Sequence, residues 1–558
     1  MCHSTDGNSL GFIGFSRSPG FHDGIWVGPV RVTNELIAAE AGSSGRWKGS
    51  HVVVLASVLL LGLGLGWQER SPDITIGGDE ATYVALSHSL AHGHYRDEFL
   101  MGTPPHPQYP PGNAAWLLLV RSLGGPDLDL VRLANLLLLA LTAVLTGDAV
   151  RRLASPWAGV GAAAAVVLHP YLLEFSGTVV SEIPYVALVT LSMWACLRAD
   201  RGGGSRWELF GYAAALAAFL TRLLGVSALG AIVATYLIRR RWRAAMAAGV
   251  GAIVAAGGWA AYLAWAGQQT IGHTYAAEIA ARAPGAGRSA LERGLWYLRT
   301  LPAFYRLPTI EGTPIDNVVW YLILFGCGGV GLWVLARKWP VLALTLVGSF
   351  LILARWIWGV ERLFLPMLPG GIAVLMVGAH TLGQRRGPKV ALLAAGSLAV
   401  LLSASALVHH AGLIKRRNCD RKDPYGPRPC FARQATRLVA AARFAGQTLP
   451  ADAILATSKP STVYHFGNRR TFPLDVFLSA VRQDSSRSVA SFGFTHVVLS
   501  EILTSDWKRV APRLYRECDL LRVVAEFPPA TVLLSVGEAD TSDGAACRYL
   551  AGRLGKSE

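Results

Sequence analysis

Long apolar runs recur along this chain from Val52 to Val408, with only short polar loops between them. A helix needs about 20 mostly apolar residues to cross the hydrocarbon core of a bilayer, and most of the runs approach that length. The composition agrees, because 52% of the 558 residues are hydrophobic and only 16% are charged. That balance is too apolar for an ordinary soluble protein of this size. The sequence therefore predicts an α-helical polytopic membrane protein.

We expect about eleven transmembrane helices, which divide the chain into three parts. Residues 1–49 are rich in Gly, Ser and Asn and lack the pattern of a signal peptide, so they form either a disordered arm or an over-extended start. The transmembrane domain covers 50–411, and a soluble domain covers 412–558. The expected spans are 50–67, 130–150, 156–174, 182–198, 207–221, 223–239, 244–266, 316–336, 339–356, 363–382 and 390–410.

The net charge of +16 reports membrane topology and not a nucleic-acid partner. The basic residues lie in every second loop, and they do not gather on one soluble face with interleaved aromatic side chains. By the positive-inside rule these loops are cytoplasmic. The basic residues concerned are Arg151, Arg152, Arg198, Arg201, Arg206, Arg239, Arg240, Arg241, Arg243, Arg337, Lys338, Arg385, Arg386 and Lys389.

Because successive spans cross the membrane in alternate directions, three segments lie on the extracytoplasmic side. They are the loop that holds Asp79, the loop from Gly267 to Pro314, and the tail after Val408. We expect a multi-pass protein of the inner (plasma) membrane with an extracytoplasmic C-terminal domain. The tail holds an even set of cysteines in an oxidising compartment, so disulfides are expected there, with the pairing left open. These cysteines are Cys419, Cys430, Cys518 and Cys547.

The tail has the pattern of a small α/β domain of about 145 residues. Short segments rich in β-branched residues alternate with helical patterns such as 432–446. The predicted strands are "ADAILATS", "TVYHFGN", "THVVLSE" and "ATVLLSV".

The first outside loop contains two segments with a helical period, 79–92 and 111–123, that are too short to cross a bilayer. We expect them to lie along the membrane interface. The prolines between them exclude helix and fix an extended backbone. This stretch is either a rigid connector or a stiff platform that presents His106, Gln108 and Tyr109 to a substrate.

Two carboxylates at the expected outer surface have both a structural and a catalytic interpretation. Asp79 is either the N-cap of the helix that begins beside Glu80, or a partly desolvated general base. Glu182 follows a potential N-cap at Ser181, so it either compensates a helix dipole or joins Asp79 at the same depth.

Three arginines, Arg222, Arg355 and Arg362, also lie at outer ends of the expected spans, and Glu361 precedes the last. They either snorkel and pair with neighbouring acids or hold a phosphate, which suits a bidentate guanidinium. A further group of polar residues permits a metal site, although this spacing is common by chance and solvated interfacial histidines are the favoured interpretation. This group comprises His88, His92, His94, Asp97 and Glu98.

Taken in order, several of these segments resemble the GT-C superfamily of membrane glycosyltransferases, and within it the bacterial relatives of protein O-mannosyltransferases and lipid A aminoarabinose transferases. The resemblance covers roughly residues 50–500. The segments that carry it are "GGDEATYVALSHSL", "YPPGNAAWLLL", "SEIPYVAL", "FLTRLLG", "ERLFLPMLP" and "TVYHFGNRR".

The resemblance implies that a sugar moves, with inversion, from a polyprenyl phosphate carrier to an acceptor outside the membrane. Asp79 would be the catalytic base, with Glu80 adjacent and Glu182 a second acid, and Arg222 and Arg362 would hold the phosphate. The polyprenyl phosphate leaves already ionised, so an arginine clamp can replace a metal and no cofactor is required. The acceptor, whether lipid, glycan or protein, is not indicated. The remaining residues expected to bind substrate are Arg355, Tyr83, His106 and Tyr109.

Two other functional classes share some of these features. A transporter or flippase of a lipid-linked or anionic substrate also uses intramembrane arginines and broken helices. Against it, the sequence shows no convincing internal repeat, and the notable charges gather at one surface. The third class is a non-catalytic envelope-assembly protein whose outside domain binds a partner.

Overall fold

The computed structural model describes residues 46–76, 79–270, 289–301, 314–356, 361–416, 419–503, 505–537 and 544–555. Nearly all of the expected N-terminal arm lies outside the described residues, as does most of the loop expected between Gly267 and Pro314.

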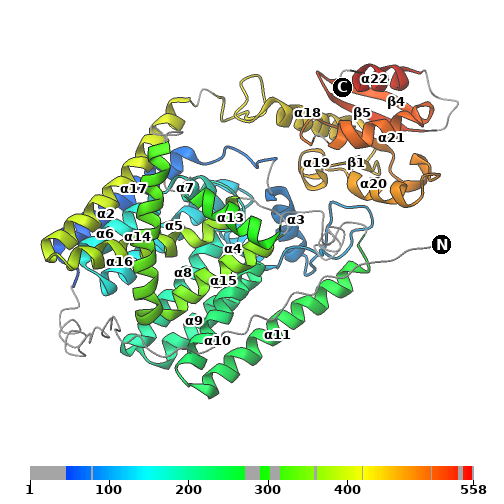
Figure 1. Ribbon diagram of the computed structural model, residues 1–558. Helices are drawn as coiled ribbons and strands as arrows, with labels where there is room; N and C mark the ends of the chain where they lie inside the picture. The colour runs from blue at the N-terminus through cyan, green and yellow to red at the C-terminus, as the bar shows by residue number, and fades with distance from the viewer. Residues whose placement is uncertain are drawn as a thin grey trace, which may run out of the picture. The chain divides into compact units, whose positions relative to one another are not determined.

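Every expected span coincides with a helix or with a pair of consecutive helices (Figure 1). The third span is broken: α6 (Pro156–Val167) and α7 (Pro170–Ser176) meet at an angle of 54°. Pro170 explains the break, because proline cannot continue the hydrogen bonds of α6. The other span helices are α2 (Gly49–Glu69), α5 (Leu128–Leu153), α8 (Glu182–Arg198), α9 (Ser205–Thr221), α10 (Val226–Ile238), α11 (Trp242–Gly267), α14 (Pro314–Lys338), α15 (Pro340–Arg355), α16 (Leu368–Gln384) and α17 (Pro388–Arg416).

Within the described residues, six helical segments are long and apolar enough to cross a membrane, or seven if α6 and α7 form one bent span. Two further helical segments, Leu223–Ile238 and Pro340–Arg355, are apolar but shorter. The chain is therefore a multi-pass helical membrane protein, and the figure of about eleven crossings stays a prediction.

Helices α14 and α16 approach so closely that their backbones touch. A Cβ atom added at Gly331 would lie 1.9 Å from the carbonyl oxygen of Val374, and one added at Gly378 would lie 1.8 Å from that of Cys327. Small residues allow this approach, which is a common basis of helix pairing in lipid. The contact fixes α16 and, with it, the 3₁₀ turn η4 (Glu361–Met367) that precedes α16.

The two expected interfacial segments are both helical, as α3 (Glu80–Ala91) and α4 (Gly112–Gly124). The proline-rich connector between them, residues 92–111, is extended as predicted. Its two arms pair where Arg96 bridges Pro105 and the Asp97 amide donates to the Pro104 carbonyl at 2.8 Å. Whether α3 and α4 lie at the membrane surface stays a prediction.

The C-terminal region forms a five-stranded sheet in the order β2-β1-β3-β5-β4. Strands β2, β1 and β3 are parallel, and β5 pairs antiparallel with both β3 and β4. The strands are β1 (Leu455–Thr457), β2 (Thr471–Pro473), β3 (His496–Leu499), β4 (Leu521–Phe527) and β5 (Thr531–Val536).

Helices cover both faces of this sheet. The predicted helix at 432–446 is α18, and α18 and α19 share one apolar cluster with the sheet, whereas the helices that follow β2 share another. The segment "TVYHFGN" is not the strand we predicted. It is helical because Pro460 begins the helix with a suitable φ angle and Asn468 ends it in the left-handed conformation. These helices are α18 (Arg433–Thr448), α19 (Pro460–Gly467), α20 (Leu474–Gln483), α21 (Ala511–Tyr515) and α22 (Ala545–Leu554).

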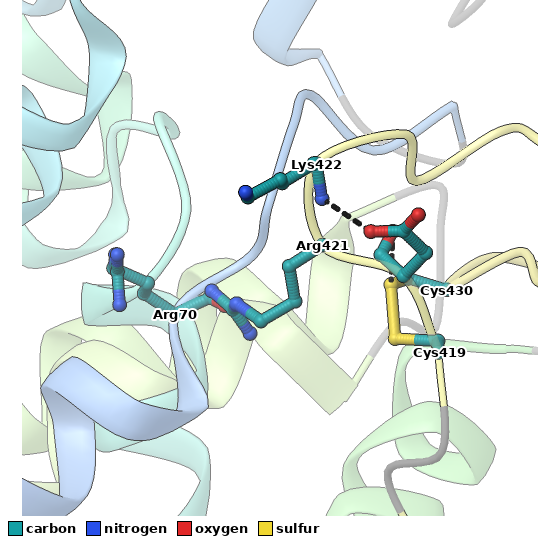
Figure 2. Close-up of a disulfide and its surroundings, with 6 residues drawn as sticks. Arg70, Cys419, Arg421, Lys422 and Cys430 are labelled. Atoms are coloured by element: carbon teal, nitrogen blue, oxygen red, sulfur yellow. Dashed lines mark hydrogen bonds between the residues drawn. A yellow bond between two sulfur atoms is a disulfide. The ribbon is translucent and has the colours of Figure 1, made fainter.

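The four cysteines of the C-terminal region form two disulfides, Cys419–Cys430 and Cys518–Cys547. The first closes a loop that docks on the segment leading from α2 to α3 (Figure 2). Arg421 donates to the backbone carbonyl of Arg70 at 2.8 Å, and the Tyr425 hydroxyl donates to the carbonyl of Ile74 at 2.6 Å. The loop thereby supports the backbone just before Asp79.

Replacing Gly378 with alanine should destabilise the protein by about 1–3 kcal/mol, because the new methyl group forces the α14 and α16 backbones apart. Thermal unfolding in detergent measures this effect. Gly329→Ala on α14 is the matched control, since nothing lies within 4 Å of its added Cβ. Equal melting temperatures for the two variants would refute the close contact.

Replacing both Cys419 and Cys430 with serine removes the first disulfide and should lower the stability by about 3 kcal/mol. The loss arises because the unfolded chain gains conformational entropy without the cross-link. Thermal unfolding of the purified double variant measures it. Cys327→Ser, at a half-buried free cysteine, is the control and should change the stability much less. A double variant as stable as the control would show that the disulfide does not stabilise the fold.

Candidate functional site

Four charged side chains from distant parts of the chain meet in one cluster, which we call the ionic cluster: Asp79, Glu182, Arg222 and Arg362. Arg222 Nη1 lies 2.7 Å from Glu182 Oε1, and Arg362 Nη2 lies 3.0 Å from Asp79 Oδ2. Arg362 Nε also lies 4.0 Å from Glu182 Oε1, which joins the two pairs. The juxtaposition expected from the sequence is therefore present.

Each member of the ionic cluster stands at the end of an element. Asp79 directly precedes α3, and its carboxylate makes no capping hydrogen bond to the amides at the start of that helix, all of which are described. Glu182 is the first residue of α8, Arg222 follows the last residue of α9, and Arg362 lies in η4. Element ends expose backbone dipoles and allow side chains from several helices to converge.

Glu182 is the deepest member of the ionic cluster, and its side chain is only 2% exposed. Its Oε1 atom accepts from Arg222, whereas Oε2 is buried with no hydrogen-bond partner among the described residues. A buried carboxylate oxygen without a hydrogen bond lowers the stability of the fold unless another group donates to it. Asp79 and Arg362 form the open edge of the cluster, with side chains 29% and 32% exposed.

Tyr83 belongs to the support of the cluster. Its hydroxyl donates to Ser181 Oγ at 3.0 Å, and the same Oγ accepts from Arg222 at 3.2 Å. Burial raises the pKa of Tyr83, so its hydroxyl keeps its proton and remains a donor. The chain of hydrogen bonds fixes the direction of Arg222 from α3 and α8 together.

Lys459 contributes a further positive charge that sequence reasoning missed. It lies between β1 and α19 in the C-terminal region. Burial lowers the pKa of its ammonium group, while the Asp79 carboxylate raises it and Arg362 lowers it further. The ammonium group therefore interacts electrostatically with both residues of the Asp79–Arg362 pair. A single lysine in "TSKP" carries no local signal, because only the fold brings it to Asp79.

Glu80 is not brought into the ionic cluster, although it is adjacent to Asp79. Its carboxylate is fully buried and accepts from the backbone amides of Thr75 and Val179. Burial raises the pKa of Glu80, and these two amides act in the opposite direction. The side chain therefore ties together the two turns that carry Asp79 and Glu182, which gives Glu80 a positioning role.

His106 also lies outside the ionic cluster, and both its ring nitrogens are occupied. Nδ1 lies 2.7 Å from Asp97 Oδ1, and Nε2 accepts from the Tyr109 amide at 2.9 Å. The amide contact fixes the proton on Nδ1, which donates to Asp97. Tyr109 in turn packs against His106 and against Tyr83, with ring centroids 5.2 and 5.0 Å apart. These contacts stiffen the connector, as its interpretation as a rigid segment requires.

Arg355 ends α15 with an exposed side chain, and among the described residues it forms no ion pair with Asp79 or Glu182. The group that permits a metal site is only partly brought together. His92 and His94 each lie 3.6 Å from Glu98, and the described part of the chain contains no group of three or more acidic, histidine or cysteine side chains arranged to hold a metal ion.

An apolar groove of about 310 Å³ is lined in part by η4, the turn that carries Arg362. Its other lining side chains come mainly from α13 (Ala290–Thr300), α14, α15 and α16, among them Phe350 and Leu375. Phe364 lies two residues after Arg362 in the same turn, so the groove and the charged cluster share one short element. An anionic head with a long apolar tail matches this combination.

The fold can be compared with solved structures. Apo ArnT from Cupriavidus metallidurans matches with a TM-score of 0.53 and 14% sequence identity, over 87% of this chain and 97% of that chain. The same protein bound to undecaprenyl phosphate matches with a TM-score of 0.52 and 15% identity, over 88% and 98%. The chain has the GT-C fold.

The fold resemblance expected from the sequence is thus confirmed at the level of architecture. No protein-family model matches the sequence, and no curated protein matches it. No role of an individual residue can therefore be taken from a relative, and the roles proposed below are assigned from the geometry of the ionic cluster.

The variant Glu80→Gln tests the positioning role. Glutamine keeps one acceptor oxygen, so one of the two buried amides loses its partner, and the protein should lose about 1–3 kcal/mol of stability. Thermal unfolding measures the loss. The control is Glu526→Gln on β4, where the side chain is exposed and should change stability by less than about 0.5 kcal/mol. If the two variants unfold alike, Glu80 does not hold the turns.

Proposed function

We propose that this chain is a membrane glycosyltransferase that moves a sugar from a polyprenyl phosphate carrier to an acceptor at the outer face of the inner membrane, with inversion. The observation that carries the proposal is the ionic cluster, which combines two carboxylates and two guanidinium groups and shares the turn η4 with an apolar groove. The fold shared with ArnT, which has been crystallised with undecaprenyl phosphate, supports the same assignment.

The donor would place its phosphate between Arg222 and Arg362 and its apolar tail in the groove. Guanidinium groups bind phosphate oxygens in a bidentate manner, which fixes the orientation of the anomeric carbon. Phosphate would compete with Asp79 for Arg362. The Asp79 carboxylate would then lose its partner at the moment when the donor is bound, which frees it to accept a proton.

The reaction would proceed by a single displacement. Asp79 accepts the proton of an acceptor hydroxyl as its oxygen bonds to the anomeric carbon, and the bond from that carbon to the phosphate oxygen breaks. The polyprenyl phosphate leaves as an anion stabilised by Arg222 and Arg362, with Lys459 adding positive charge at the open edge. Attack opposite the leaving group inverts the anomeric configuration.

Glu182 would act from the buried side of the cluster. Its Oε2 atom has no hydrogen-bond partner among the described residues. This oxygen could therefore accept a hydrogen bond from a sugar hydroxyl. Its Oε1 holds Arg222 in place for the phosphate. Glu182 is therefore assigned to binding and orientation, and Asp79 to proton transfer.

The variant Asp79→Asn tests the proposal directly. Purified full-length protein in lipid nanodiscs receives labelled polyprenyl phosphate sugar and a membrane extract as the source of acceptors, and the released lipid phosphate is measured. We expect turnover to fall about 10²- to 10⁴-fold, because asparagine cannot accept the proton, while undecaprenyl phosphate still binds. Asp452→Asn, at an exposed position of the C-terminal region, should leave turnover unchanged.

Full turnover in Asp79→Asn would remove Asp79 as the base. Movement of the labelled lipid across the membrane without release of its sugar would instead favour a flippase.

A further inference from the structure

A cavity of about 380 Å³ lies between the connector and the C-terminal region, and none of the functional roles above uses it. Its volume falls within the roughly 300–1,000 Å³ typical of small-molecule sites. One wall comes from α3 and the connector, and the other from the turns that follow β1, β2 and β3. The polar residues used below are Thr82, Asp97, His106, Ser458, Asp475 and Arg509.

Residues on both walls of the cavity lie close in sequence to Asp79 or to Lys459. Thr82 lies three residues after Asp79, which places the two side chains on one face at the start of α3. Its hydroxyl donates to Ser461 Oγ at 2.8 Å, so α3 contacts the C-terminal region at this point. On the opposite wall, Ser458 and Pro460 flank Lys459, whose ammonium group interacts with Asp79.

The charged side chains that face the cavity leave a small excess of negative charge, because His106 is neutral and Asp97 keeps its charge. The Asp97 carboxylate accepts the His106 proton at 2.7 Å, so that pair is satisfied internally. Asp475 and Arg509 contribute one charge of each sign. A phosphorylated or carboxylated ligand would therefore meet no excess of positive charge, which separates this cavity from the arginine-rich ionic cluster.

The uncharged part of the lining is mixed. Hydroxyl groups of Thr82, Ser458 and Ser505 alternate with apolar surface from Phe99 and Leu478. The Thr82 and Ser458 hydroxyls donate to Ser461 and Asp506, so their oxygens can accept hydrogen bonds from the hydroxyls of a sugar. Apolar side chains suit the C–H faces of a sugar ring. The cavity is thus matched to a neutral polyhydroxylated molecule.

We propose that this cavity binds the acceptor, and that the acceptor is a neutral carbohydrate whose reacting hydroxyl points toward Asp79. The inference rests on the proposed function, because it assigns the second substrate of the same reaction. The donor's own sugar is the other source of carbohydrate near Asp79. It would be held through the lipid phosphate, so donor binding distinguishes the two.

Saturation-transfer NMR on the full-length protein in nanodiscs tests the proposal, with mannobiose, galactobiose and a glucuronate-containing disaccharide as probes. We expect a neutral disaccharide to bind, and Leu478→Trp to fill the cavity and weaken that binding at least about tenfold. Gln483→Trp introduces the same side chain at an exposed position of α20 and should leave binding unchanged. Undecaprenyl phosphate should bind all three proteins equally.

Three results would overturn the inference: no neutral disaccharide binds the wild-type protein, Leu478→Trp binds it as well as wild type does, or the acidic disaccharide binds more tightly than the neutral ones. Weaker binding of undecaprenyl phosphate by Leu478→Trp would also overturn it, by assigning the cavity to the donor. Failure of the proposed function has a separate signature, since the wild-type protein would then not bind undecaprenyl phosphate or Arg362→Gln would bind it as well as wild type.

Discussion

The pairing of Asp79 with Arg362 and of Glu182 with Arg222 is the interaction on which the rest of this structure depends. Moving an isolated charge out of water costs far more than one ion pair returns, so buried pairs contribute little net stability while the loss of one partner costs about 3–5 kcal/mol. The stability that these ion pairs add therefore does not by itself explain why the cluster is present. Among the described residues one Glu182 oxygen has no hydrogen-bond partner, and the Asp79–Arg362 edge is partly exposed, which agrees with the proposal that a ligand completes the cluster.

The surrounding structure holds these charges in place from several directions. Glu80 ties the turn before α3 to the turn before α8, and the Tyr83–Ser181–Arg222 chain of hydrogen bonds orients one guanidinium group. The glycine contact between α14 and α16 fixes the turn that carries Arg362. The disulfide loop supports the backbone before Asp79 through the hydrogen bond from Tyr425 to Ile74. The site is thus held mainly by rigid element ends, as a site that must orient two substrates requires.

The sequence predicted much of this arrangement because its signals are strong and local. Apolar runs of membrane length predicted the helices, and the sidedness of the arginines placed Asp79, Glu182, Arg222 and Arg362 at one expected surface. Lys459 was missed because its role exists only after the sheet region folds against α3. Glu80 was expected in the site beside Asp79 because the sequence does not show that its carboxylate is buried against the amides of Thr75 and Val179. The helix α19 was taken for a strand because a short apolar segment with β-branched residues fits both, and the starting Pro460 was the overlooked signal.

The central claim is that Arg222 and Arg362 receive the phosphate of a lipid carrier. A cryo-electron microscopy structure of the full-length protein in nanodiscs with undecaprenyl phosphate tests it most directly. We expect phosphate density within hydrogen-bond distance, about 2.7–3.2 Å, of both guanidinium groups. Arg362 should be released from Asp79, and the lipid tail should lie in the groove beside Phe364. Phosphate density elsewhere, with the Asp79–Arg362 pair intact, would contradict it.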